Sequence, residues 1–441
     1  MKRFKVLVLL AIYLLAFSLP AHAQNRYIVR HSLGLKGLNL TCLLLNCNVL
    51  GSLGDPAGQV YVITTKPTVN PLLFLTLLLN QIGVIDAEPD QIVNVMAYSS
   101  SSNTGTGPAA LYDSTPINYY GTTVRHGYVF QPATTLIHLA DAQSNYKTTG
   151  GGVVAVIDTG VDPAQPVLKS VLVPGYDFVN NKTSVDETAD INQSTMAVLD
   201  NNNAQPGFVN QSTMAVLDQS TMAVLDGPQY AAFGHGTMVS GVIHLVAPTA
   251  QIMPLKAFTA AGTGNLSDVV RAIYFASFHG AKVINMSFDF SSSSTELKFA
   301  LNTANLLGVI CVASSGNDGK QISVYPASYS NVIGAASTSN IDQRSTFSNY
   351  GSQVVWVAAP GEGVVTTYPF GSYAAVWGTS FSAPMVSGTA ALLVGLSHGV
   401  AQQNTAASSL AHADYINSQL NHGRLNVNTA VDSWLLYIGP K

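Results

Sequence analysis

From about residue 119 onward, short runs of consecutive apolar residues alternate with longer segments in which apolar positions recur every three or four residues. The apolar runs predict strands at residues 153–157, 252–255, 283–286 and 309–313. The longer segments predict helices, of which one begins with Ser267 as its N-cap and ends at Gly280, and another ends at Gly308. Uninterrupted apolar strands separated by helices are typical of an α/β fold, a parallel sheet with helices on both faces.

The N-terminal part of the chain has a different pattern. Strands are predicted at residues 27–29 and 60–63. A helix is predicted from the N-cap Asn70 to about Gln81, with Pro71 at its first position and its apolar segment 72–79 buried. These elements indicate a small α+β domain.

The first 23 residues predict a secretory signal peptide. Three basic residues within the first five positions precede an apolar run over residues 6–19, and a small-x-small motif ends at Ala23. Fourteen apolar residues fall short of the about 20 that a membrane-spanning helix needs, so no membrane anchor is expected. We expect cleavage after about Ala23 and a secreted or extracytoplasmic protein.

Four segments are therefore predicted along the chain. They are a signal peptide over residues 1–23, the α+β domain over 24–97, a Ser/Gly-rich linker over 98–118 and the α/β domain over 119–441. A compact fold is expected, because only 10% of the residues are charged. The net charge of −4 gives no basic surface for nucleic acid.

Three cysteines are present. Cys42 and Cys47 are close enough in sequence to form a local disulfide in an oxidising compartment. Cys311 lies inside an apolar run and is interpreted as an inert, buried thiol. No histidine motif accompanies any of them, so the cysteines do not indicate a cysteine protease.

One eight-residue sequence, Gln-Ser-Thr-Met-Ala-Val-Leu-Asp, occurs three times, at residues 193–200, 211–218 and 219–226. The repeat is too short for a solenoid, so we interpret residues 190–228 as a duplicated insert in a surface loop. The alternative is that the aspartates ending each copy contribute oxygens to a Ca²⁺ site. Nothing in their spacing brings them to one point.

Three Gly-flanked blocks, at residues 156–160, 234–237 and 378–384, carry an acid, a base and a nucleophile in that order. Asp158 ends a predicted strand, and His235 has glycine on both sides at a predicted helix start. Ser380 opens an apolar segment that predicts a buried helix with Pro384 in its first turn. A serine hydroxyl becomes a nucleophile when a base lies within hydrogen-bond reach and an acid orients that base.

A fourth polar residue follows the strand predicted at 309–313. The Asn317 amide could donate a hydrogen bond to a developing oxyanion, or Asn317 could be an ordinary turn residue. The first-turn amides at Ser380 would point at the same negative charge, because a helix N-terminus is electropositive.

These blocks, in the order Asp, His, Ser, resemble the subtilisin-like serine proteases, or subtilases. The resemblance covers roughly residues 150–436, and residues 24–97 look like a subtilase propeptide, an intramolecular chaperone and inhibitor. It implies a triad of Asp158, His235 and Ser380, with an oxyanion hole formed by Asn317 and the Ser380 N–H. It also implies two backbone edges that bind extended peptide. They are Ser287, Phe288 and Asp289 on one side and Ser314, Ser315 and Gly316 on the other.

Two features depart from the family pattern. Asp289 stands where the family commonly has glycine, so its side chain either points outward or adds negative charge that favours basic substrate residues. The interval between Asp158 and His235 is long and contains the repeat. This leaves any structural Ca²⁺ site unassigned.

We therefore expect a monomeric serine endopeptidase that acts on polypeptides, is made as a self-processing zymogen and needs no cofactor for its chemistry. The alternatives are a catalytically inactive subtilase-fold binding module, an α/β-hydrolase esterase and a carboxyl-type serine peptidase. The esterase lacks its Gly-x-Ser-x-Gly motif, and the carboxyl peptidase would carry an acid in place of His235. Retention of all four site residues disfavours the binding module.

Overall fold

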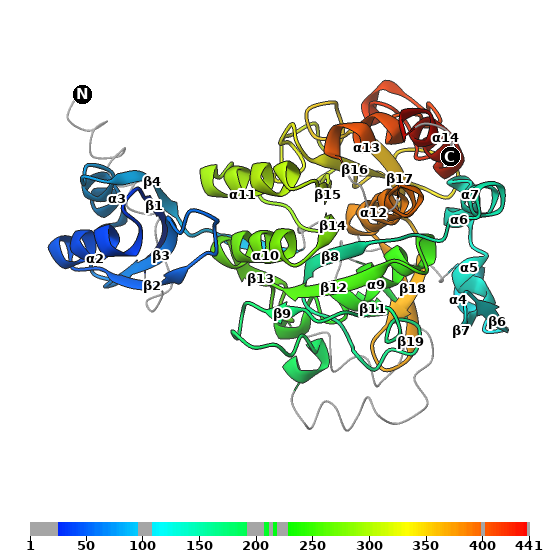
Figure 1. Cartoon of the computed structure of the whole chain (residues 1–441). Coiled ribbons are helices and arrows are strands. Elements are labelled where there is room, and N and C mark those ends of the chain that lie inside the picture. Colours follow the sequence, from blue (N-terminus) through cyan, green and yellow to red (C-terminus); the bar gives the residue numbers. More distant parts are fainter. Residues whose placement is uncertain are drawn as a thin grey trace, which may run out of the picture. The chain divides into compact units, whose positions relative to one another are not determined.

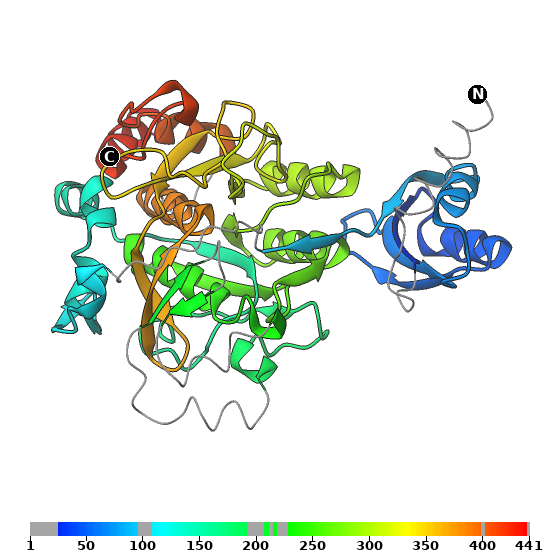
Figure 2. The same cartoon turned by 180° about the vertical axis from the view of Figure 1, so that it is seen from behind.

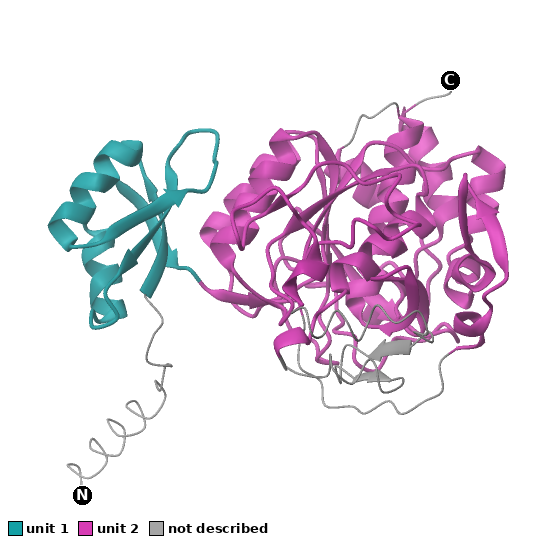
Figure 3. Cartoon of the chain, turned by 90° about the horizontal axis from the view of Figure 1, so that it is seen from below, with its two compact units in different colours: residues 1–90 teal, residues 91–441 magenta. Residues whose placement is uncertain are grey.

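The computed structural model describes residues 25–95, 108–191, 207–210, 215–217, 228–397 and 402–438. The chain divides into two compact units, residues 1–90 and 91–441 (Figure 3). The first is an α+β unit and the second is an α/β unit built on a parallel sheet with helices on both faces, so the predicted fold class is confirmed. The predicted boundary between residues 97 and 98 lies outside the described residues.

Unit 1 follows the order β-α-β-β-α-β. Its elements are β1 (Asn25–His31), α2 (Gly34–Leu45), β2 (Asn48–Ser52), β3 (Val60–Thr65), α3 (Pro71–Leu79) and β4 (Val84–Pro89). The strands form an antiparallel sheet in the order β2-β3-β1-β4, which is the split β-α-β arrangement. Its core gathers Tyr27, Leu38, Ile63, Phe74 and Leu78 between the sheet and the two helices.

Helix α3 of unit 1 differs from expectation in its burial. Asn70 caps α3 as predicted, since its side chain accepts the Leu73 N–H at 3.0 Å. The predicted burial of the segment 72–79 is wrong. Only Phe74 and Leu78 are buried in α3, and Leu72 is 76% exposed. Helix α2 was not predicted, and it too exposes several leucines.

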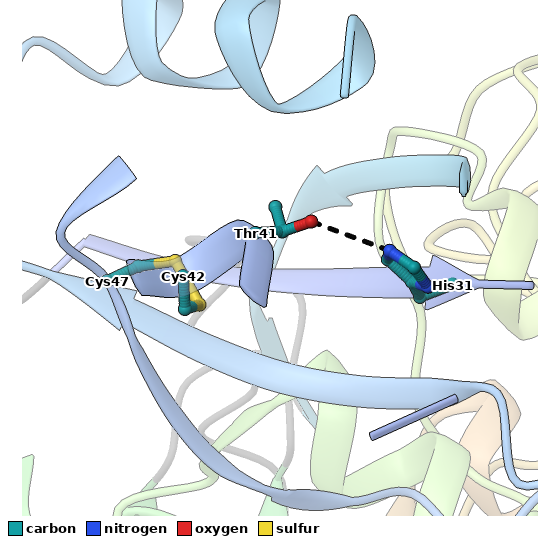
Figure 4. Close-up of a disulfide and its surroundings, with 4 residues drawn as sticks. All are labelled: His31, Thr41, Cys42 and Cys47. Carbon is teal, nitrogen blue, oxygen red and sulfur yellow. Dashed lines mark hydrogen bonds between the residues drawn. A yellow bond between two sulfur atoms is a disulfide. The ribbon is translucent and has the colours of Figure 1, made fainter. Parts of the chain in front are cut away.

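The local disulfide anticipated for unit 1 is present. Cys42 in the last turn of α2 is bonded to Cys47 just before β2 (Figure 4). The Cys47 N–H also donates to the Cys42 carbonyl at 3.0 Å, and Asn46 between them has a left-handed backbone. The disulfide therefore fixes the turn that ends the helix. Cys311 is free and buried in unit 2, as expected, and burial raises the pKa of its thiol to about 12.

Seven parallel strands form the central sheet of unit 2. They are β8 (Val153–Asp158), β9 (Tyr176–Asp177), β12 (Gln251–Lys256), β14 (Ala281–Met286), β15 (Ile310–Ser314), β16 (Ile333–Thr338) and β17 (Val357–Pro360). Their order across the sheet is β17-β16-β15-β14-β8-β12-β9. The chain order reverses beside β8, so loops from β8, β14 and β15 open at one edge. In open parallel sheets this edge is where ligands bind.

Helices cover both faces of this sheet (Figures 1 and 2). One face carries α9 (His235–Val246) and α12 (Thr379–Leu396), with α13 (Gln403–Leu410) and α14 (Val427–Ile438) outside α12. The other face carries α10 (Leu266–Phe278) and α11 (Thr295–Leu306). The N-cap of α10 is Asn265, so the prediction of Ser267 in that role is wrong by two residues.

Short elements complete unit 2. Residues 108–146 supply α4 (Ala109–Tyr112), β6 (Pro116–Tyr119), β7 (Thr122–Arg125), α5 (His126–Val129), α6 (Pro132–Leu136) and α7 (Leu139–Tyr146). A second sheet, in the order β11-β10-β19-β18, contains β10 (Gly207–Asn210), β11 (Ala215–Leu217), β18 (Val364–Tyr368) and β19 (Ser372–Trp377). A two-stranded ladder pairs β5 (Ile92–Asn94) with β13 (Thr263–Asn265), and the 3-10 turns are η1 (Glu187–Asp190), η3 (Pro228–Tyr230) and η4 (Ser418–Leu420).

Most of the repeat insert lies outside the described residues. Of its three copies, the structure describes only 215–217, which form β11. The three aspartates that end the copies, Asp200, Asp218 and Asp226, are not among the described residues. The calcium alternative for the insert therefore stays a hypothesis.

Helix α12 is the central buried helix of unit 2. It is the one helix in the described ranges that is long and apolar enough to cross a membrane, but 89% of its apolar window is buried, as in a core helix. Pro384 is its sixth residue and not in the first turn, which corrects the prediction. Because proline has no N–H, the Ser380 carbonyl loses its usual helical donor and instead accepts the Ser287 hydroxyl at 2.8 Å.

Candidate active site

Asp158 ends strand β8 with its side chain fully buried. Its Oδ1 accepts the Thr159 N–H at 2.7 Å and lies 2.7 Å from Nδ1 of His235. The chain turns at once because Gly160 has φ +112°, a conformation that other residues adopt only with strain. The strand end therefore fixes the carboxylate against the histidine ring.

His235 is the first residue of α9, after Gly234 with φ +84°. Gly236 explains the second flanking glycine, since a Cβ there would lie 2.0 Å from the Gly160 carbonyl oxygen. The helix can thus approach the β8 turn closely enough for the Asp158 contact. A neutral His235 that donates from Nδ1 to Asp158 presents Nε2 as an acceptor. This Nε2 is buried and makes no hydrogen bond with the residues the structure describes.

Ser380 is the second residue of α12, at the positive end of the helix. Its hydroxyl donates to the Ser287 carbonyl at 3.3 Å, so it is not paired with His235 in this conformation. The neighbouring Phe381 ring lies 5.6 Å from the His235 ring, centroid to centroid. The serine and the histidine thus belong to one site, and the hydrogen bond between them requires a rotation of the serine side chain.

Asn317 lies in the loop after β15, and Thr379 fixes its orientation. Its Oδ1 accepts the Thr379 N–H at 2.9 Å and the Thr379 hydroxyl at 3.0 Å. Both of these hydrogen bonds go to the oxygen, which leaves the Nδ2 group of the amide available as a donor. The N–H of Ser380, in the first helical turn, has no intrahelical partner. Two donors are therefore available beside the serine.

The two predicted substrate-binding segments lie on neighbouring strands of the sheet. Ser287, Phe288 and Asp289 follow β14, while Ser314, Ser315 and Gly316 end β15 and continue beyond it. The Ser314 hydroxyl donates to the Phe288 carbonyl at 3.4 Å, which links the segments. The Ser287 and Ser315 side chains point into the protein, where both are fully buried. Backbone groups therefore form most of what these segments can offer a peptide.

Ser287 also connects the first segment to helix α12. Asn285 donates to the Ser287 hydroxyl at 2.9 Å, and Ser387, two turns along α12, donates to the Asn285 side-chain oxygen at 2.8 Å. The Ser287 hydroxyl in turn donates to the Ser380 carbonyl. This buried chain of hydrogen bonds holds the start of α12 against β14.

Asp289 is turned toward the second segment. Its Oδ2 lies 3.0 Å from the position that a Cβ on Gly316 would occupy. Burial, and secondly the negative charge of Asp318, raise the pKa of Asp289 to about 7. The carboxyl group is therefore close to half-charged at neutral pH and stands between the two segments.

Glu187 is a buried site residue that sequence reasoning missed. Its Oε2 accepts the Thr159 hydroxyl at 2.8 Å, and its Oε1 accepts the Thr237 N–H at 3.2 Å and the Thr237 hydroxyl. These threonines directly follow Asp158 and precede the second turn of α9, so one carboxyl group joins the acid loop to the histidine helix. Burial raises the pKa of Glu187 to about 7, although both threonine bonds act to lower it.

A buried lysine lies beside Glu187. Lys256 ends β12, is 1% exposed and donates to Asp190 at 2.7 Å and to the Thr159 carbonyl at 2.6 Å. Lys256 directly follows the apolar strand predicted at 252–255. A charged residue in that position indicates a buried partner of opposite charge. Glu187 gave no such signal, because nothing in its local sequence indicates burial.

A segment of the chain itself pairs with the backbone of the Ser287–Asp289 segment and of β13, which together we call the groove side of the site. Strand β5 pairs antiparallel with β13, matching Asn94 with Thr263, and Asn94 also forms an antiparallel bridge with Asp289. The Val95 N–H donates to the Gly262 carbonyl at 3.0 Å. Residues 92–95 therefore form a middle strand between β13 and the Ser287–Asp289 segment.

Among the described residues, no group of three or more histidine, cysteine, aspartate or glutamate side chains could hold a metal ion. The chemistry available at the site is that of a serine, a histidine, a carboxylate and amide donors. On a parallel α/β sheet, these are the groups that a serine hydrolase uses.

The comparisons with known proteins give the family. The model of the subtilase family, Peptidase S8, matches residues 149–423. The chain belongs to the subtilase family, whose members are serine endopeptidases that need no cofactor for catalysis.

Two relatives and one solved structure are similar to this chain. The chain is 34% identical to thermitase of Thermoactinomyces vulgaris over 64% of its length, and the match covers 88% of thermitase. It is also 34% identical to a thermophilic serine proteinase of Bacillus sp. (strain AK1), but spans only 58% of that protein. Among solved structures, fervidolysin of Fervidobacterium pennivorans, described as a keratinolytic enzyme related to subtilisin, is 21% identical with a TM-score of 0.68. That match covers 96% of this chain and 62% of fervidolysin, and it bears on the fold.

Proposed function

We propose that this protein is a secreted serine endopeptidase made as a self-processing zymogen, with Ser380 as nucleophile, His235 as general base and Asp158 as the acid that orients it. The observation that carries the proposal is the 2.7 Å contact between Asp158 and His235 beside a serine at a buried helix N-terminus. The family match supports the reaction class.

In the proposed reaction, the Ser380 hydroxyl turns from the Ser287 carbonyl to Nε2 of His235 and loses its proton to it while attacking a peptide carbonyl. Asp158 stabilises the imidazolium that forms. The Asn317 Nδ2 group and the Ser380 N–H donate to the oxyanion. His235 then protonates the leaving amine, and water releases the acyl group from Ser380.

The same geometry supports a substrate mode in which extended peptide adds as a strand. Ser287, Phe288 and Asp289 would line one side and Ser314, Ser315 and Gly316 would approach the scissile end. The pairing of residues 92–95 with β13 and with Asp289 supports this mode. It also supports the role of residues 24–97 as an inhibitory propeptide, because substrate cannot pair with backbone groups that are already paired.

Secretion rests on the signal-like residues 1–23 and on a disulfide in unit 1. Disulfides persist in oxidising compartments and are rare in the cytosol. The proposed partners are polypeptide substrates and the propeptide itself. A structural Ca²⁺ site and the monomeric state stay predictions.

The direct test compares residues 24–441 as wild type and as Ser380→Ala. We expect the wild type to shorten itself and then digest casein, and the variant to stay full-length and inert. Intact mass measures the shortening, and casein hydrolysis measures the activity. If both proteins fold but both stay full-length and inert at neutral and alkaline pH, with and without Ca²⁺, the protein is an inactive binding module of this fold.

A further inference from the structure

We infer that Glu187 is a positioning residue of the active site. Its ionised carboxyl group holds the turn after β8 and the first turn of α9 at the separation that the contact between Asp158 and His235 requires. This inference rests on the proposed function and adds to it a residue that touches neither the substrate nor the reacting atoms.

The first link runs through Thr159. This residue directly follows Asp158 and donates its hydroxyl to Oε2 of Glu187 at 2.8 Å. The same hydroxyl accepts the N–H of Gly236, the residue after His235, at 2.9 Å. One carboxyl oxygen therefore orients a hydroxyl that itself bridges the turn after β8 and the start of α9.

The second link runs through Thr237. Oε1 of Glu187 accepts the Thr237 N–H at 3.2 Å and also the Thr237 hydroxyl. That hydroxyl in turn accepts the N–H of Asp162, in the turn after β8, at 2.8 Å. The turn and the helix are thus joined at both threonines, and Glu187 is common to the two links.

The backbone around Glu187 leaves little room for adjustment. The Glu187 N–H donates to the Val161 carbonyl at 3.2 Å, and the Val161 N–H donates to the Val185 carbonyl at 3.0 Å. A Cβ on Gly160 would lie 2.4 Å from the Val185 carbonyl oxygen, and one on Gly236 would lie 2.0 Å from the Gly160 carbonyl oxygen. Since the three segments pack backbone to backbone, a shift of Glu187 is transmitted to both of its neighbours.

The hydrogen bonds to Glu187 require its ionised form. Each threonine oxygen already accepts a backbone N–H, so each hydroxyl directs its own proton to the carboxyl group. A carboxylate only accepts hydrogen bonds, whereas a carboxylic acid must donate one and would displace one of these donors. Protonation of Glu187 therefore loosens the links between the turn and the helix.

Both forms of Glu187 are populated near neutral pH. Burial raises its pKa to about 7, although the bonds from both threonines act to lower it. The ionisable groups around it are Lys256 on β12, Asp158 on β8, His235 on α9, Tyr368 on β18 and Asp190 on η1. His235 acts as a base only after losing its own proton, so the acid side of the activity profile should contain two ionisations.

The first measurement is the pH profile of kcat/KM for an uncharged peptide substrate, in the wild type and in Glu187→Gln. Between about pH 5 and pH 7 the wild-type profile should rise by more than tenfold per pH unit, and that of the variant by tenfold, because one ionisation has been removed. At about pH 9 the variant should lose kcat about 10- to 100-fold with little change in KM, because its amide must donate where only donors face it. A merely structural role would change the amount of folded enzyme and leave the steepness unchanged.

Glu296→Gln is the matched control. Glu296 is a fully buried glutamate in the first turn of α11, on the opposite face of the central sheet. This variant should keep the wild-type steepness, and Asp289, which also titrates near pH 7, contributes equally to all three profiles. If Glu187→Gln keeps the wild-type steepness and kcat, the inference is overturned but the proposed function stands. A wild type as inert as Ser380→Ala overturns both.

Two variants of Thr159 test the route and decide the matter if Glu187→Gln does not fold. Thr159→Ser keeps the hydroxyl and should keep the wild-type kcat and the steep profile. Thr159→Val has nearly the same volume but no hydroxyl, and it should lower kcat about tenfold and lose the steepness. Folding of both is checked by urea unfolding in the Ser380→Ala background. Equal kcat and equal profiles for the two folded variants would overturn the inference, because Glu187 would then not act through Thr159.

Discussion

The two sides of the site are built from different material. On the catalytic side, Asp158 and His235 are buried side chains in contact with each other, and the buried Glu187 accepts hydrogen bonds from Thr159 and Thr237 beside them. On the groove side, the partner of β5 is backbone, at Gly262, Thr263 and Asp289. A side-chain site loses its chemistry with one substitution, whereas a backbone edge binds peptide whatever its side chains are. We therefore expect steep mutational effects on the catalytic side and shallow ones on the groove side.

The largest effect is expected at Asp158. Asp158→Asn keeps the shape of the side chain but removes the negative charge that fixes the His235 tautomer and stabilises the imidazolium. The rate of self-cleavage should fall about 10⁴-fold. Conversion of full-length to mature chain, followed by gel densitometry against Ser380→Ala as the floor, measures this rate. A loss of less than tenfold would show that the buried contact orients nothing in the reaction.

The second effect concerns Asn317, which lies where the two sides meet. Asn317→Ala removes one oxyanion donor and should lower kcat about 10²- to 10³-fold, the range found for this substitution in subtilisin. KM should change little, because the amide would act in the transition state only. Steady-state hydrolysis of a peptide substrate by the processed enzyme separates the two constants. A change confined to KM would instead assign Asn317 to the groove.

The third effect is a pH dependence from Glu187. Its pKa of about 7 in the folded protein exceeds its ordinary value of 4.5, so its contribution to stability is present at low pH and is lost as the pH rises through about 7. The loss is on the order of 3 kcal/mol. In a Ser380→Ala background, which prevents self-digestion, urea unfolding from pH 4 to pH 9 should show this decline. Glu187→Gln should flatten it, and an unchanged slope would contradict the assignment.

The smallest effect is expected at Asp289, the one charged side chain on the Ser287–Asp289 segment. Above pH 8 its carboxylate should favour Lys or Arg before the cleaved bond, and Asp289→Asn should reduce that preference about twofold to fivefold. Below pH 6 the two enzymes should agree, because protonation neutralises a carboxyl whose pKa is about 7.

A charge-matched control keeps this small effect interpretable. Asp432→Asn removes the same charge from an exposed position on α14. The ratio of kcat/KM for a lysine substrate to that for its glutamine analogue should be unchanged in this control. Equal ratios for wild type and Asp289→Asn would show that the groove does not read charge.

The strands of the central sheet and the positions of the four motif residues could be predicted because each follows from a local pattern. Continuous apolar runs marked β8, β12, β14 and β15, and glycines marked the turns beside Asp158 and His235. Glu187 and the burial of α3 could not be predicted, because both depend on partners distant in sequence. Glu187 becomes a site residue only when Thr159 and Thr237 meet it.

Pro384 illustrates a partial success. The sequence predicted that Pro384 lies in a buried helix. It did not predict that the carbonyl left without a helical donor would accept the hydroxyl of Ser287, nearly 100 residues earlier. The pairing of β5 is a similar case, because the residues around 92–95 do not indicate the two edges that this strand joins. The sequence therefore predicted local secondary structure, but it did not predict contacts between residues that are distant along the chain.

The leucines that α2 and α3 leave uncovered have a practical consequence for handling the protein. Leu43, Leu44, Leu72 and Leu73 are each at least 60% exposed on a unit with a small core. Apolar area of this kind promotes self-association in proportion to concentration. If the proposed self-processing cuts this unit free, it should precipitate from concentrated preparations and persist in dilute ones. Refolding and activation are therefore best carried out at high dilution, and turbidity on concentrating the mixture would report that release has taken place.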